Sequence, residues 1–194
     1  MTSGSFYRST SFDDCRVGSV ENYFIRENLQ KARGNFFFEA GACNGFHLSQ
    51  TAILEKEHKW NGVLVEPHFQ MHKDLVNGDR KATCQSWVLG DGSECYYEQK
   101  KEGLLGHSQL RNKKVNADCI PCDTTTIEEA LIHAAAPRRI DYMVIDVENA
   151  WEQVLSGIDF ESREIDFLAV EIKEETSNQL TPWIEKLRTH GLRF

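Results

Sequence analysis

Residues 35–45 read NFFFEAGACNG, and this segment carries the strongest structural signal in the chain. Three consecutive phenylalanines form an apolar run of high β-propensity, which suits a central strand buried on both faces. Glu39 follows, and then Gly41 and Gly45 bracket a short turn before a helix-like segment that opens at Phe46. Glycine permits a sharp turn and a close approach of the backbone to a ligand. A strand, a glycine turn and a helix N-terminus predict the nucleotide cradle of an α/β fold, although a tight turn by itself requires only one of the glycines.

A second strand-like run ends in an acid about one helix length later. The segment WNGVLVEPH (60–68) contains the apolar residues 63–65, followed by Glu66. A carboxylate at the end of the second parallel strand can accept hydrogen bonds from both ribose hydroxyls of a nucleoside. Pro67 also suits the first position of a helix, where the helix dipole favours an acid. Because two successive apolar runs both end in acids, the sequence favours a cofactor site over a helix start.

Two later runs repeat this pattern. The run IDYMVIDV (140–147) carries Asp146 near its end and is followed by Glu148, and the run IDFLAVEI (165–172) ends near Glu171. In an open parallel sheet, ligands bind outside the carboxyl ends of the strands, so these acids should face the same crevice as the first two. Alternating strands and helices predict an α/β fold with a doubly wound, mostly parallel sheet.

Taken in order, these motifs resemble the FkbM-type methyltransferases, a class I, Rossmann-like family that uses S-adenosyl-L-methionine. The resemblance runs from about residue 35 to residue 194. Its anchors are EAGACNG (39–45), GVLVEP (62–67), SWVLGDGSECYYE (86–98), TTTIEEAL (124–131), IDYMVIDVENAWEQVLSGIDF (140–160) and AVEI (169–172). The ordered set is far more specific than any single motif.

The resemblance implies a role for each matching residue. The methionine part of the cofactor is expected at Glu39, Gly41, Asn44 and Gly45, the ribose at Glu66, and the adenine beside the turn Leu89, Gly90 and Asp91. Asp146 is expected both beside the cofactor and, with Glu148 and Glu171, among the catalytic residues that line the acceptor side. The implied activity is O-methyl transfer to a hydroxyl of a small molecule or glycan, with Asp146 or Glu148 as general base.

The chain departs from the family on the acceptor side. The family continues its Asp-x-Glu motif with glycine and, two positions later, a second glutamate, where this chain has Asn149 and Trp151. Glu152 points about 100° away on a helix and is not an obvious replacement. Trp151 is expected in the core rather than as a stacking platform for the acceptor. A changed acceptor, weakened catalysis, and a catalytically silent domain that binds the cofactor or another protein all stay open.

Composition agrees with one domain over residues 21–194, preceded by a flexible arm over residues 1–20 that is rich in Ser, Thr and Gly. No apolar run approaches the length of a membrane span, and the N-terminus lacks the apolar core of a signal peptide, so a cytoplasmic protein without a membrane partner is expected. The formal net charge of -8 makes a nucleic-acid partner unlikely. The sequence does not indicate an oligomeric state.

Periodicity predicts helices over residues 21–31, 46–58, 67–76 and 149–157. Two more are expected over Thr125–Ala135, with a Thr125…Glu128 capping box, and Thr181–His190, with Thr181 as N-cap and Gly191 as stop. Class I methyltransferases end with an antiparallel strand pair, whereas this sequence ends at residue 194. Either that pair is truncated or the sequence is a segment of a longer protein.

The cysteines offer two further hypotheses. Cys119-Ile-Pro-Cys122 has the spacing of a redox motif and precedes a helix, but it does not follow a first strand, so a redox role is not favoured. A zinc site joining this pair to Cys95 or His107 is an alternative. Neither is strong enough for a metal site to be predicted.

Overall fold

The computed structural model describes residues 28–99, 108–172 and 180–192. The predicted N-terminal arm and most of the helix expected over residues 21–31 lie outside the described residues. The described end of that segment is a single 3-10 turn, η2 (Leu29–Lys31).

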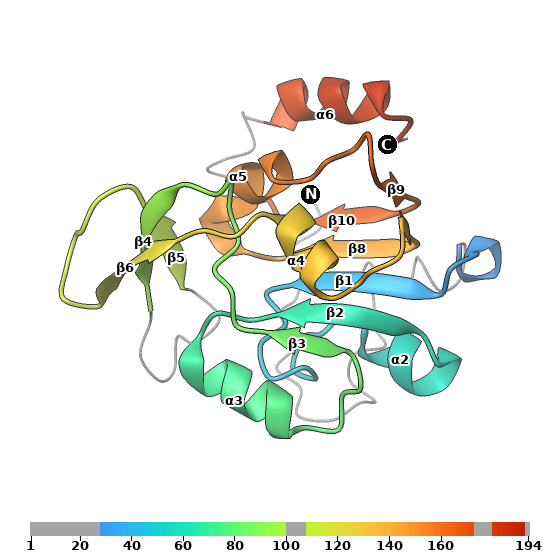
Figure 1. Cartoon of the computed structure of the whole chain (residues 1–194), viewed down its shortest axis with the longest axis horizontal. Helices are drawn as coiled ribbons and strands as arrows, with labels where there is room; N and C mark the ends of the chain where they lie inside the picture. Colours follow the sequence, from blue (N-terminus) through green and yellow to red (C-terminus); the bar gives the residue numbers. More distant parts are fainter. Residues whose placement is uncertain (1–27, 100–107, 173–179, 193–194) are drawn as a thin grey trace, which may run out of the picture.

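The central element is a five-stranded sheet in the order β10-β8-β1-β2-β3, with every neighbouring pair parallel. Its strands are β1 (Phe36–Ala40), β2 (Asn61–Val65), β3 (Thr83–Gln85), β8 (Tyr142–Ile145) and β10 (Leu168–Val170). Figure 1 shows them side by side, with their carboxyl ends at one edge. The predicted α/β fold with a mostly parallel sheet is confirmed.

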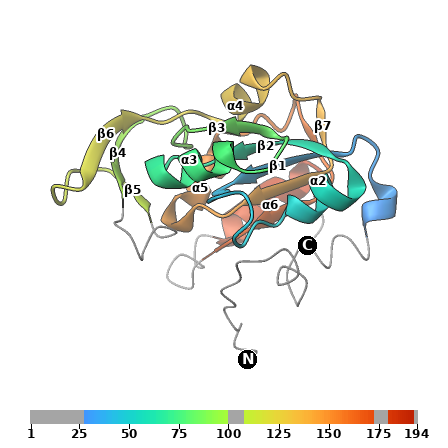
Figure 2. The ribbon, with the colours of Figure 1, turned by 90° about the horizontal axis from the view of Figure 1, so that it is seen from below.

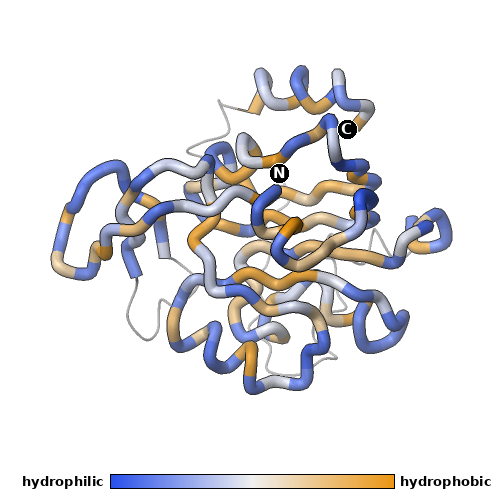
Figure 3. Tube along the Cα trace, viewed as in Figure 1, coloured by the Kyte–Doolittle hydropathy of each residue, from blue (hydrophilic) through white to orange (hydrophobic). Residues whose placement is uncertain are grey.

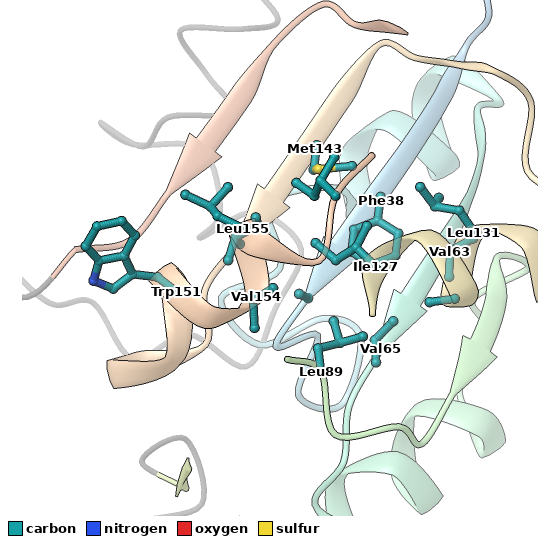
Figure 4. Packing of buried hydrophobic residues seen from close by; sticks show 14 of the residues in the cluster. Phe38, Val63, Val65, Leu89, Ile127, Leu131, Met143, Trp151, Val154 and Leu155 are labelled. Atoms are coloured by element: carbon teal, nitrogen blue, oxygen red, sulfur yellow. The ribbon is translucent and has the colours of Figure 1, made fainter. Parts of the chain in front are cut away.

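Helices cover both faces of this sheet. Successive side chains of a strand point to opposite faces, and Phe37 and Phe38 of β1 accordingly belong to two different core clusters. The cluster of Phe37 is closed by α2 (Ala52–His58) and α3 (Phe69–Asn77). The cluster of Phe38 is closed by three helices, α4 (Ile127–His133), α5 (Trp151–Ser156) and α6 (Leu180–Thr189), and Figure 4 shows part of it. The sheet is therefore doubly wound, as predicted.

A second, smaller sheet was not predicted. It is antiparallel, in the order β5-β4-β6, and consists of β4 (Glu94–Glu98), β5 (Gln109–Arg111) and β6 (Cys119–Asp123). Figures 1 and 2 both show it beyond the carboxyl ends of the parallel strands. The sequence indicates only a turn near the adenine in this region.

The third and fourth predicted strands are each divided in two. Their first parts, β7 (Arg139–Ile140) and β9 (Glu164–Ile165), pair with each other at the amino end of the sheet. Asp141 follows β7, and its buried carboxylate accepts hydrogen bonds from the backbone N–H groups of Arg33 at 2.7 Å and Phe36 at 3.1 Å. This side chain secures the entry to β1.

Two predicted helices begin later than expected. The helix expected over residues 46–58 begins only at Ala52, so an irregular loop, and not a helix N-terminus, follows the glycine turn. The helix expected from Pro67 begins at Phe69. His68 is its N-cap, and its Nδ1 accepts from the Met71 N–H at 3.4 Å.

The remaining helix ends are close to their predicted positions. The capping box of α4 is formed by Thr126 and Glu129, one residue later than predicted. Thr181 lies inside α6 and is not its N-cap, whereas Gly191 follows the helix with φ +87°, as expected for a stop. Every helix in the described part of the chain is too short or too polar to traverse a bilayer.

Candidate functional site

The ends of β1 and β8 meet at Gly41. The Asp146 N–H donates to the carbonyl of Ala40, the last residue of β1, at 3.1 Å. Gly41 has φ +82°, and a Cβ at this position would lie 1.9 Å from the carbonyl oxygen of Asp146. No other residue fits without moving one of the two strand ends. This glycine therefore allows two of the predicted site segments to come together.

The loop after Gly41 is shaped by two further predicted residues. The Asn44 side chain accepts from the N–H groups of Phe46 at 3.0 Å and His47 at 2.8 Å, which makes a tight local turn. Gly45 has φ +84°, and a Cβ there would lie 2.6 Å from Leu75 of α3. Packing of the loop on α3 thus accounts for Gly45. Contact of either residue with a ligand stays a prediction.

Glu39 is only 2% exposed, and the loop uses both of its carboxylate oxygens. One oxygen accepts from the Gln50 N–H at 2.8 Å, and the other from the hydroxyls of Ser49 at 2.8 Å and Thr51 at 2.5 Å. These bonds hold the far end of the loop against β1. They explain why residues 46–51 do not continue as helix.

Arg80 reinforces the same loop and was missed by the sequence analysis. Its buried guanidinium lies 3.1 Å from the Glu55 carboxylate and donates to Ser49, to Thr51 and to the Gly45 carbonyl. The spacing of Glu55, three residues after Ala52, places it on the inward face of α2, but the sequence does not indicate which cation it meets. Arg80 itself lies outside any motif.

Glu66, at the end of β2, is 6% exposed. Its carboxylate accepts from the Cys43 N–H at 2.9 Å and from the His68 N–H at 2.8 Å, one bond to each oxygen. Burial raises the pKa of Glu66 above its usual range, and the two backbone hydrogen bonds offset part of that rise. Each oxygen keeps a second lone pair, so the group can still accept hydrogen bonds from a ligand.

Cys43 lies among three of the predicted acids. Burial, and then the nearby carboxylates of Glu66, Asp146 and Glu39 in that order, together raise the pKa of its thiol to about 12. The structure therefore brings together acids from the ends of β1, β2 and β8. A thiol with this pKa stays protonated at neutral pH and is not a nucleophile. Its place at the centre of the site was not predicted.

The residues predicted for the acceptor side lie at the ends of β8 and β10. Asp146 is half-buried directly after β8. Glu148 begins the 3-10 turn η4 (Glu148–Ala150), is 8% exposed and has φ +60°. Glu171 is exposed after β10, and its N–H donates to the Ile145 carbonyl at 2.8 Å. Their contact with an acceptor stays a prediction.

The predicted adenine turn is fixed by its neighbours. Leu89 is 6% exposed and pairs with Thr125, and a Cβ on Gly90 would lie 2.7 Å from Thr124. Asp91 is exposed, and its carboxylate accepts from the Gln153 side chain of α5 at 2.9 Å. Hydrogen bonds from Gln153 and then Ser93 lower the pKa of Asp91. The turn thus has a buried apolar side chain, Leu89, and an exposed ionised side chain, Asp91.

The positions that depart from the family pattern serve the fold. The Asn149 side chain donates to the Leu110 carbonyl at 3.2 Å and ties η4 to β5. Trp151 is fully buried and packs edge-on against Trp183 with ring centroids 6.5 Å apart, so its predicted core position is confirmed. Glu152 accepts from the Trp183 indole N–H at 3.1 Å. Glu152 is thus engaged with α6.

The cysteine motif lies on β6, where residues three apart point to opposite faces. Cys119 and Cys122 therefore do not face each other. Cys122 instead lies opposite Cys95 of β4, with 3.6 Å between the sulfur atoms. No cluster of three or more potential metal ligands occurs in the described ranges, and His107 lies outside them.

A cleft of about 350 Å³ lies at the opposite, amino end of the sheet, beside β7 and β9. It is lined by charged residues, but its two half-buried arginines are already paired with carboxylates. Arg139 lies 2.6 Å from Asp166, and Arg163 lies 2.7 Å from Glu128. The carboxyl edge, where the buried Glu66 carboxylate can still accept hydrogen bonds, is the better candidate for a ligand site.

A doubly wound parallel sheet with a glycine loop and a buried acid at the ends of adjacent strands defines an α/β protein of the nucleotide-cofactor-binding class. The sequence profile of the methyltransferase FkbM domain matches residues 39–194, and the chain belongs to this methyltransferase family. No curated protein and no solved structure matches the chain significantly. Membership of the family implies use of S-adenosylmethionine.

Proposed function

We propose that the chain is an S-adenosylmethionine-dependent O-methyltransferase that acts on a hydroxyl of a small molecule or glycan. The observation that carries the proposal is Glu66, a buried carboxylate whose two oxygens are oriented by the N–H groups of Cys43 and His68. Membership of the FkbM family supplies the reaction class.

The residues present fit this cofactor. Glu66 has one lone pair free on each oxygen, which suits the two adjacent hydroxyls of a ribose. Low exposure strengthens such bonds, because water competes weakly for a buried acceptor. Gly41 lets the backbone come close to a ligand at the carboxyl edge of the sheet. This donor and acceptor set supports a nucleoside with a free 2′,3′-diol.

S-adenosylmethionine supplies, when bound, a methyl group activated on a sulfonium. The chain's own contribution is to place the acceptor oxygen in line with that methyl group and to exclude water. Asp146, at the end of β8 beside Gly41, is the proposed group that orients the acceptor hydroxyl and takes its proton. Glu148, two residues later, is the second candidate for this role.

The negative charge at the carboxyl edge indicates which methyl acceptors suit the site. The carboxyl edge gathers Glu39, Glu66 and Asp146 around Cys43, and the whole chain has a formal net charge of -8. A phosphate backbone would be repelled by this edge. A neutral or cationic hydroxylated molecule is therefore the proposed acceptor.

The test is a screen of hydroxylated small molecules and glycans with S-adenosylmethionine, read as release of S-adenosylhomocysteine. Turnover with one acceptor class, and none with single-stranded RNA or DNA, is the expected result. Tight cofactor binding without turnover in any class would refute the enzyme assignment.

A catalytically silent cofactor-binding or interaction module is the second candidate. It is favoured by one observation: the positions at which the family has its glycine and second glutamate are used here for structure. Asn149 binds the Leu110 carbonyl, and Trp151 is fully buried against Trp183. The same screen separates the two candidates, because this module would bind the cofactor and release no product.

A further inference from the structure

The small antiparallel sheet has a face turned toward the candidate site. It lies beyond the carboxyl ends of the parallel strands (Figures 1 and 2). On β4, Tyr97 points to the same face as Cys95, because they are two residues apart. Leu110 of β5 lies directly opposite Tyr97 and packs against the core cluster of Phe38. The Leu110 carbonyl accepts a hydrogen bond from the Asn149 side chain of η4. The face that carries Tyr97 therefore adjoins the end of β8.

The other face of β4 has paired polar groups. The Glu98 carboxylate lies 2.7 Å from Arg111 and accepts from the Asn116 side chain at 2.9 Å. Tyr97, in contrast, has a polar group that is not paired in the described part of the chain. It is 7% exposed, and its hydroxyl has no hydrogen-bond partner among the described residues. Ser108 lies near the hydroxyl and tends to lower its pKa, but the two groups do not reach hydrogen-bonding geometry.

The surroundings of this hydroxyl belong to the candidate site. Burial is the main cause that raises the pKa of Tyr97, and the nearby groups Glu66, Cys43 and Cys122 raise it further. The hydroxyl therefore stays protonated and is available as a donor. Tyr97 and Glu66 are close enough to interact electrostatically, yet no hydrogen bond joins them. A buried donor and a buried acceptor that do not contact each other leave a place for a polar ligand group between them.

We propose that Tyr97 is a ligand-binding residue of the cofactor site and that its hydroxyl donates a hydrogen bond to a ribose oxygen held by Glu66. The inference rests on the proposed function. The chemistry is complementary: a carboxylate is acceptor-only and uses the hydrogens of the ribose hydroxyls, so the ribose oxygens are left as acceptors for a donor such as phenol. The antiparallel sheet thereby forms a wall of the nucleoside site.

The test is the substitution Tyr97→Phe, which removes the hydroxyl and keeps the ring. Calorimetric titration with S-adenosylhomocysteine is expected to show a dissociation constant about tenfold higher than that of the wild type. The melting temperature of the ligand-free protein should be unchanged or higher, because an unpartnered buried hydroxyl is lost. A purely structural role would lower this melting temperature.

Tyr96→Phe is the matched control. Tyr96 is adjacent on β4, half-buried and turned to the other face, so its hydroxyl should not affect binding. Titration with 5′-methylthioadenosine, which lacks the amino-acid part, should show the same tenfold loss for Tyr97→Phe. A loss with S-adenosylhomocysteine alone would overturn the ribose assignment.

Two further outcomes separate this inference from the proposed function. If the wild type binds S-adenosylhomocysteine and Tyr97→Phe binds it equally well, the role of Tyr97 is refuted while the cofactor assignment stands. If the wild type binds neither ligand, the proposed function is refuted and the inference fails with it.

Discussion

The backbone N–H of Cys43 donates a hydrogen bond of 2.9 Å to the carboxylate of Glu66. This bond joins the loop after β1 to the end of β2, two segments that the chain separates by a complete helix. Cys43 has φ +47°, a conformation that side-chain-bearing residues adopt infrequently. The loop thus holds an unfavourable backbone angle at the point where it orients the buried acid. We infer that the acid is preorganised for a ligand, which lowers the entropic cost of binding.

The first prediction concerns pH. The proposed binding of the cofactor by Glu66 uses its ionised form, and burial raises its pKa above the ordinary glutamate value of about 4.3. Affinity for S-adenosylhomocysteine should therefore fall as the pH is lowered from 7.5 to 5, before an ordinary glutamate would titrate. Glu66→Gln is expected to bind weakly at every pH and should show no such dependence. Calorimetry at a series of pH values measures both.

The raised pKa of Glu66 also affects folding stability, which should change with pH in the direction opposite to cofactor affinity. Between the unfolded and the folded pKa of Glu66, the folded protein binds more protons at this site than the unfolded chain. The ionised Glu66 therefore costs stability above its folded pKa, and this cost is relieved as the pH falls through it. Urea unfolding at pH 7.5 and pH 5 measures the free energy of unfolding of the wild type and of Glu66→Gln. The wild type should be more stable relative to the variant at pH 5 than at pH 7.5. A relative loss would contradict the raised pKa.

The second prediction separates backbone strain from close packing. Gly41→Ala adds a Cβ at φ +82° and 1.9 Å from the Asp146 carbonyl oxygen, and should cost about 2–5 kcal/mol. Gly191→Ala has a similar φ, +87°, with nothing within 4 Å, and should cost only about 1–2 kcal/mol. Urea unfolding compares the two. Equal losses would show that β1 and β8 do not meet as described.

The third prediction concerns the buried arginine. Arg80→Met leaves Glu55 buried without its cation and removes the donors to Ser49 and Thr51, and should cost about 3–5 kcal/mol of unfolding free energy. Arg138→Met removes the same charge from a side chain that is 68% exposed and should change stability by about 0.5 kcal/mol or less. Similar effects of both variants would argue against the network.

The fourth prediction concerns the reaction. Asp146→Asn is nearly isosteric and should leave binding of S-adenosylhomocysteine within a few-fold of the wild type. With an acceptor from the screen, turnover should fall by about 100-fold or more, the usual scale for a lost acid–base group. Asp159→Asn, in the exposed loop after α5, is the control and should keep full turnover. Undiminished turnover of the Asp146 variant would remove Asp146 from the mechanism.

Local patterns in the sequence predicted four of the five parallel strands, because each of the four contains a short apolar run, whereas β3, which reads TCQ, has no such run and was not predicted. The apolar runs at 36–38 and 63–65 lie within β1 and β2. The helix expected over residues 46–58 failed at its start for a non-local reason. The Glu39 carboxylate binds Ser49, Gln50 and Thr51, and these bonds replace a helical turn. The hydrophobic periodicity of a sequence does not show when side-chain hydrogen bonds to a distant residue compete with a helical turn.

Only part of the site was predicted, because contacts between residues far apart in the sequence leave no local pattern. Glu66 follows an apolar run and could be found from the chain alone, whereas the pairing of Arg80 with Glu55 joins residues far apart in sequence. The capping box of α4 moved by one residue because residues 124–126 are all threonine and each can cap. The antiparallel sheet that carries Tyr97 is formed by short strands of mixed polarity, which resemble loops in sequence.

The central claim is that a nucleoside cofactor binds at the carboxyl edge through Glu66. Calorimetric titration of the wild type and of Glu66→Gln with S-adenosylhomocysteine tests it most directly, with circular dichroism to show that both proteins are folded. We expect one site on the wild type and an affinity lower by about tenfold or more in the variant, the scale of a lost charge-assisted hydrogen bond. Equal affinities in the two proteins, or no binding by the folded wild type, would contradict the claim.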